Sequence, residues 1–195
     1  MVTPRAELVH WAFAAGFLFL GLLLLAEAIV GPRVFGMRRW RVYLWPSLAF
    51  ALGLLLWPVA VFYTNSTVHM LAHSVWAQTL MFAGAAELGL VRGKLRSEYW
   101  KLAAPVAFAV SGAAFLVHEA NPWLYSRSAF VHHFCGWALL VGALFPLGAA
   151  FKPRSLVFNA GYALMLVAVA VALYSSRDTA AIFGHLSQSA GVAHR

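Results

Sequence analysis

Histidines are the residues of this sequence best suited to chemistry, and eight occur among its 195 residues. His69 and His73 are four residues apart, a spacing that places both on one face of a helix. His132 and His133 are adjacent at the start of a strongly apolar run. Neutral imidazole binds copper, zinc and iron, and two imidazoles can hold a haem. What these histidines can do therefore depends on the elements that position them.

The composition is that of a protein built to lie in a lipid bilayer. Apolar residues make up 63% of the chain and charged residues only 10%, whereas about a quarter of the residues in soluble domains are charged. The mean hydropathy is +0.78. The net charge of +8 comes from basic residues distributed by loop, which indicates membrane orientation rather than nucleic-acid binding. The single cysteine, Cys135, excludes an intramolecular disulfide.

Six apolar runs are each close to the roughly 20 residues that a membrane-spanning helix needs. They are expected at about residues 8–30, 42–63, 67–91, 100–119, 130–150 and 155–175. The first is too long for a signal-peptide core and is expected to be retained. The small residues in FAGAAELG and VSGAAF would let helix backbones approach closely. Residues 1–195 are thus expected to form one all-helical, multi-pass membrane bundle with no soluble domain.

Basic residues gather in alternate loops, which predicts the orientation of the bundle. The first, third and fifth loops carry most of them: Arg33, Arg38, Arg39, Arg41, Arg92, Lys94, Arg96, Lys101, Lys152 and Arg154. Because cytoplasmic loops are enriched in Lys and Arg, these loops are expected to be cytoplasmic. Both termini would then lie outside, in the periplasm of a bacterium. Trp11 and Trp76 are expected in the outer aromatic belt of the cell membrane.

This topology places six histidines at the outer ends of the predicted spans. They are His10, His69, His73, His118, His132 and His133. His10, His73, His118 and one member of the adjacent pair each lie about one turn inside the boundary, so four helices can direct imidazoles toward one level. Ionisable residues inside membrane spans are costly and usually face the bundle interior. A shared histidine site near the outer face is therefore the leading hypothesis.

The two adjacent histidines cannot face the bundle centre equally, because neighbouring residues of a helix point about 100° apart. His132 shares its face with small residues such as Cys135 and Gly136, whereas His133 shares its face with Trp137. Small residues suit close helix packing. We therefore expect His132 to point inward and His133 to lie at the interface or to support a ligand.

Other side chains could support or complete such a site. Glu119 follows His118 and is expected either to be solvated, to supply an oxygen ligand, or to orient an imidazole. Cys135 is a soft ligand close to the histidines in sequence. Glu27 and Glu87 lie near the inner ends of their spans, too far away to join the outer cluster. They are expected to hydrogen-bond neighbouring helices or to pair with basic loop residues, rather than to carry protons.

Three stretches of the chain resemble the transmembrane protein 45 family of multi-span proteins. VHWAFAAGFLFLGLLLL is similar to the family's opening helix, HMLAHSVWAQTLMFAGAAELGL to its middle helix, and FLVHEANPWLYSRSAFVHHFCGWALL to its late histidine-rich region. The likeness covers about residues 9–145, although the pair His132–His133 replaces a His-x-His pattern. The resemblance implies a multi-span fold and a set of noteworthy histidines, but no particular reaction.

Three kinds of function are compatible with these residues. The first is a membrane protein that binds copper, zinc or iron near the outer face and could be redox-active. The second is a cytochrome with a single haem b, ligated by two of His73, His118 and His132, that exchanges electrons with quinone or a periplasmic electron carrier. The third is a non-catalytic accessory partner of other membrane subunits, or a proton-linked transporter. No nucleotide-binding loop or catalytic triad is present, so the sequence leaves open whether the protein is an enzyme.

Overall fold

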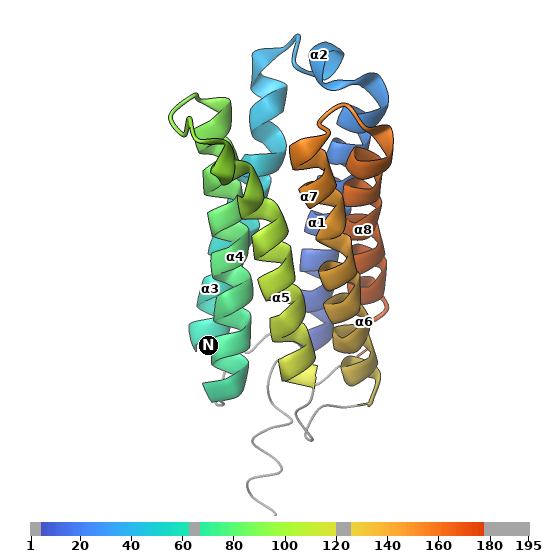
Figure 1. Cartoon of the computed structure of the whole chain (residues 1–195). Coiled ribbons are helices and arrows are strands. Elements are labelled where there is room, and N and C mark those ends of the chain that lie inside the picture. The colour runs from blue at the N-terminus through green and yellow to red at the C-terminus, as the bar shows by residue number, and fades with distance from the viewer. Residues whose placement is uncertain (1–4, 63–66, 120–125, 178–195) are drawn as a thin grey trace, which may run out of the picture.

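The structure, a computed structural model, describes residues 5–62, 67–119 and 126–177 of the chain. Within these ranges every regular element is helical and no strand occurs. Figure 1 shows the long helices running side by side as one elongated bundle. The prediction of an all-helical fold is confirmed for this part of the chain.

The helices closely follow the apolar runs of the sequence. Their order is α1 (Ala6–Val30), α2 (Pro32–Phe35), η1 (Arg39–Tyr43), α3 (Leu44–Phe62), α4 (Thr67–Val91), η2 (Glu98–Leu102), α5 (Ala103–Glu119), α6 (Ser126–Gly142), α7 (Leu144–Phe151) and α8 (Leu156–Tyr174), where η marks a short 3-10 helix. The most extensive packing joins α3 with α4, α1 with α8, and α5 with α6. Contacts of α4 with α5 and of α6 with α8 link these three pairs.

The fifth apolar run is divided into two helices at Ala143. Pro146 has no backbone N–H to donate to the carbonyl oxygen of Gly142, and α6 ends at Gly142. Helical hydrogen bonding resumes where the N–H of Leu147 donates to the carbonyl oxygen of Ala143 at 3.2 Å. The single span predicted at 130–150 is therefore an interrupted helix.

Five segments within the described residues are long and apolar enough to cross a membrane. They are Ala6–Val30, Arg39–Phe62, Glu98–His118, Ala129–Phe151 and Leu156–Tyr174. The remaining long helix, α4, has 25 residues but is too polar to join this set, because it includes side chains such as Ser74, Gln78 and Thr79. It still packs along both α3 and α5 (Figure 1).

The outer surface of the bundle is strongly apolar. Large side chains such as Phe19, Leu55 and Val171 are exposed, while Leu166 and Val169 are buried between the helices. Extensive exposed apolar surface is unfavourable in water but suits a helix bundle surrounded by lipid. The distribution of side chains therefore supports the placement of this bundle in a membrane.

Glycines allow three pairs of helices to approach closely in the bundle. A methyl group on Gly112 of α5 would lie 2.7 Å from the carbonyl oxygen of Gly136 on α6. A methyl group on Gly84 of α4 would lie 2.6 Å from the carbonyl oxygen of Pro46 on α3, and α1 meets α8 similarly at Gly21. The expected close contacts at FAGAAELG and VSGAAF are therefore confirmed.

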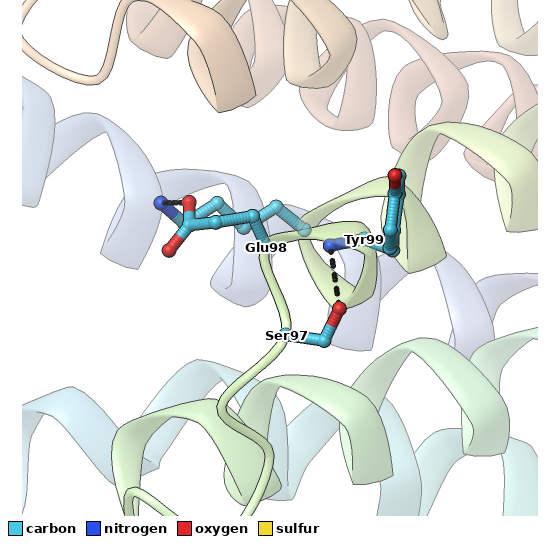
Figure 2. A network of polar contacts seen from close by, with 4 residues as sticks. Ser97, Glu98 and Tyr99 are labelled. Carbon is cyan, nitrogen blue, oxygen red and sulfur yellow. Dashed lines mark hydrogen bonds and ion pairs between the residues drawn. The ribbon is translucent and has the colours of Figure 1, made fainter.

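The basic loops gather at one end of the bundle. The segments between α1 and α3, between α4 and α5, and between α7 and α8 all lie there (Figure 1). We call this the basic end. At the start of η2, the N–H of Tyr99 donates to the hydroxyl of Ser97 at 3.4 Å, and Glu98 forms an ion pair with Lys101 (Figure 2). These contacts stabilise η2, the short helix that directly precedes α5.

Candidate functional site

Four histidines from four helices meet at the end of the bundle opposite the basic end. They are His10 on α1, His73 on α4, His118 on α5 and His132 on α6, and we call them the histidine cluster. Their ring centroids form a chain, with separations of 5.8 Å from His10 to His132, 4.9 Å on to His118 and 5.2 Å on to His73. Each of these three contacts is edge-to-face.

The histidine cluster is largely closed off from the surface. The exposed fractions of His118, His132 and His73 are only 1%, 3% and 7%, and His10 is half-buried. Buried polar groups are costly unless they bind a partner, and ionisable residues in membrane helices usually mark a functional site. The burial of three imidazoles at one level therefore makes this cluster the leading site in the described part of the chain.

Two stacked aromatic rings pack against the imidazoles. Trp76 stacks on Phe115 at a centroid separation of 3.8 Å, and its ring lies 4.4 Å from that of His73 and 5.5 Å from that of His118. The prediction that Trp76 belongs to the outer aromatic belt is wrong, because Trp76 is buried. Three residues after His73 on α4, it shares the face that turns into the bundle.

Two polar contacts beside these aromatic rings connect α4 with α5. The indole N–H of Trp76 donates to the carbonyl oxygen of Ser111 at 3.2 Å, and the hydroxyls of Thr79 and Ser111 are 2.7 Å apart. Both contacts are largely shielded from solvent, where hydrogen bonds gain strength from the low dielectric constant. They fix the relative position of the two helices that carry His73 and His118.

The segment that follows α8 positions His10. The hydroxyl of Ser176 lies 3.2 Å from Nδ1 of His10, and the indole N–H of Trp11 donates to the carbonyl oxygen of Ser176 at 3.1 Å. The Arg177 guanidinium packs over the Trp11 ring at 5.2 Å. A hydrogen bond to one imidazole nitrogen orients the ring and sets which nitrogen remains for a ligand. Ser176 is therefore part of the site, although no pattern in the sequence indicates this role.

The adjacent histidines point in different directions, as the neighbouring small residues indicated. His132 is buried, whereas His133 is exposed and its Nε2 accepts a hydrogen bond from the indole N–H of Trp137 at 3.1 Å. Cys135 is fully buried among apolar side chains such as Val131. His133 thus lies outside the cluster, on the surface of α6.

Two candidates from the sequence cannot be placed in the site. His69 belongs to α4 and Glu119 to α5, but their side chains lie outside the part of the chain that the structure describes. Their proposed roles remain predictions. Glu27 and Glu87 lie away from the histidine cluster, as predicted, and they line a separate cavity at the basic end.

A small cavity adjoins the histidine cluster. It has a volume of about 80 Å³, and His10, His73 and His132 line it together with mainly apolar side chains from α1, α3, α4, α5, α6 and α8. Within the described residues, no group of three or more His, Cys, Asp or Glu side chains is already arranged to hold a metal ion. The four imidazole rings are in contact with one another, but their nitrogens do not converge on one point as the ligands of a metal ion would.

Comparisons of this chain with protein-family models, with curated proteins and with solved structures found no match. The function is therefore inferred from the geometry of the site.

Proposed function

We propose that this protein is a multi-pass protein of the cell membrane whose histidine cluster binds a transition-metal ion near the outer face. The observation that carries the proposal is the meeting of four imidazoles from α1, α4, α5 and α6 at successive centroid separations of 4.9 to 5.8 Å. Imidazole is a preferred ligand of copper, zinc and iron. Four such groups on separate helices can enclose an ion within the bundle.

The proposed topology has six spans, with α4 as the sixth. α4 is 25 residues long, and a helix of that length can cross a hydrocarbon core of roughly 30 Å. Its polar side chains include Thr79, whose hydroxyl is hydrogen-bonded to that of Ser111 on α5. This polar group therefore has a partner inside the bundle and need not face lipid. With six spans the basic loops face the cytoplasm and α1 begins on the outer side.

The spacing of the imidazoles suits a shared ion. Zinc–imidazole bonds are about 2.0–2.1 Å long, and adding about 1 Å from nitrogen to ring centre places two rings on a tetrahedral ion about 5 Å apart. The centroids of His118 and His132 are 4.9 Å apart and those of His73 and His118 are 5.2 Å apart. Because the terminal torsion of histidine is soft, ring rotation can direct the nitrogens of these three residues toward one ion. His10 supplies a fourth position.

The size of the adjoining cavity favours an ion over a haem. Sites for organic cofactors typically have volumes of about 300–1,000 Å³, whereas the cavity beside the histidine cluster measures about 80 Å³. Among divalent ions, a set of imidazoles binds copper more tightly than zinc. We therefore expect the affinity for Cu²⁺ to exceed that for Zn²⁺.

Metal loading of the purified protein tests this proposal. The protein would be stripped with a chelator in detergent, loaded with Cu²⁺ or Zn²⁺, dialysed and examined by elemental analysis. We expect one retained ion per chain, and little retention by the double variant His73→Ala/His118→Ala. A wild-type protein that retains neither metal would contradict the proposal. A Soret band with one iron per chain would support the haem instead.

A further inference from the structure

A second and larger cavity opens at the basic end of the bundle, away from the histidine cluster. Its volume is about 390 Å³, and it is lined by residues of α1, α3, α4, η2, α5, α7, α8 and the segment after α7. The polar part of its lining comprises Glu27, Glu87, Lys101, Arg154, Asn159 and Tyr162. This volume falls within the range of about 300–1,000 Å³ that is typical of small-molecule sites.

The two carboxylates reach this cavity from different helices. Glu27 lies on α1 and Glu87 on α4, each about one turn before its helix ends. Both are half-buried, and neither carboxylate group forms a hydrogen bond or an ion pair with another described residue. Of the expected pairings, the electrostatic effect of Lys101 on Glu87 is present among the described residues. A carboxylate inside a membrane helix is costly without a partner, and a bound cation would offset that cost for both.

The basic residues of the lining offset these carboxylates only in part, since the charge of Lys101 acts on Glu87 as well as on Glu98. Lys101 forms its ion pair with Glu98, at the start of η2 (Figure 2). Arg154 is exposed in the segment between α7 and α8, where water screens its charge. The two carboxylates therefore share the cavity with one ammonium group that also pairs with Glu98 and one guanidinium group exposed to water.

Aromatic and apolar walls indicate which kind of cation would fit. Trp45 and Tyr162 both line the cavity, with ring centroids 6.3 Å apart and planes nearly perpendicular at 83°. Ring faces attract cations, and Leu24, Pro146 and Leu156 add apolar surface. A metal ion, by contrast, takes about six oxygen ligands at roughly 2.0–2.6 Å and would leave most of this volume unfilled.

We propose that this cavity binds an organic ammonium ion with an apolar body. The carboxylates of Glu27 and Glu87 offset its charge, and Trp45 and Tyr162 pack against it. The site lies at the opposite end of the bundle from the histidine cluster and does not depend on metal binding there. The failure of either proposal would leave the other unaffected.

Calorimetric titration of the detergent-purified protein with benzyltrimethylammonium tests this site. The anion 3-phenylpropionate, which has a similar ring and size, serves as the matched probe of opposite charge. We expect saturable binding of one cation per chain and no saturable binding of the anion. Equal binding of the two probes, or no saturable binding of the cation at millimolar concentration, would overturn the proposal.

Variants of the lining locate the bound cation. Glu27→Gln and Glu87→Gln keep the shape of each side chain and remove its charge, so each should weaken cation binding about tenfold or more. Arg154→Gln removes a charge from the mouth and should leave binding unchanged or tighter. Helix content and thermal unfolding, measured by circular dichroism, would verify that each variant is folded. Full cation binding by a folded Glu27→Gln/Glu87→Gln double variant would also overturn the proposal.

Discussion

The imidazoles of His118 and His132 have ring centroids 4.9 Å apart, although one residue lies near the end of α5 and the other near the start of α6. The approach of their helices at Gly112 and Gly136 allows this separation, because neither residue has a side chain between the two backbones. A methyl group at Gly112 would lie 2.7 Å from the Gly136 carbonyl oxygen and 2.8 Å from the backbone nitrogen of Leu140. The geometry of the cluster thus depends on small residues outside it.

Replacing this glycine should separate the two helices. Gly112→Ala is expected to destabilise the bundle by about 1–3 kcal/mol, as overpacking of a close contact does, and to weaken metal binding by displacing His118. Thermal unfolding in detergent and metal titration would measure the two effects. Ala113→Val is the control, because Ala113 is exposed on the same helix. An unchanged unfolding temperature for Gly112→Ala would show that the helices can adjust without cost.

The adjacent histidines provide a matched pair of variants. His132→Ala should weaken Zn²⁺ binding by at least about tenfold, because it removes a buried imidazole from the cluster. His133→Ala should leave the affinity nearly unchanged, because that side chain is exposed and bonded to Trp137. Competition titration against a zinc-binding dye would compare the two variants. Equal losses, or a greater loss at His133, would contradict the assigned orientation.

Ser176 is expected to act through His10. Removal of its hydroxyl by Ser176→Ala frees the imidazole to rotate, and the loss of such an orienting contact typically lowers metal affinity by about 10- to 100-fold. Ser175→Ala is the matched control, because the Ser175 hydroxyl bonds only to the carbonyl oxygen of Ala172 on its own helix among the described residues. Copper titrations of the two variants would check the prediction. Indistinguishable affinities would remove Ser176 from the site.

Much of the fold could be predicted from the sequence, because apolar runs of about 20 residues have few alternatives to membrane helices. The inward direction of His132 was also predictable from the small residues on its face. The break at Ala143 was not predicted, although Pro146 provides its physical cause. For α4, composition alone does not show how its polar side chains are accommodated. The hydroxyl of Thr79 meets that of Ser111 on α5, and only the packing of the bundle brings these two residues together.

The site was only partly predictable for a related reason. Four histidines could be assigned to one level from their positions in the spans, but the ring contacts among them depend on helix packing. Tryptophan is common at membrane interfaces, which favours an interfacial Trp76, but its position three residues after His73 places it on the inward face of α4. Ser176 lies 166 residues from His10 in the sequence, and a single serine has no pattern that could reveal the contact.

The topology can be tested by labelling single cysteines from outside intact cells. In a Cys135→Ala background, Thr67→Cys and Lys94→Cys place exposed thiols at opposite ends of α4. A membrane-impermeant maleimide should label the cysteine at 67 in intact cells and the one at 94 only after lysis. Labelling of both, or of neither, before lysis would contradict a spanning α4.

X-ray absorption spectroscopy of the zinc-loaded protein tests the central claim most directly, because it observes the atoms around the metal. If the histidine cluster holds the ion, the spectrum should show nitrogen ligands at about 2.0–2.1 Å with the outer-shell scattering of imidazole. The His118→Ala/His132→Ala variant should lose most of that imidazole signal or fail to retain zinc. A wild-type spectrum with oxygen ligands alone and no imidazole scattering would contradict the account.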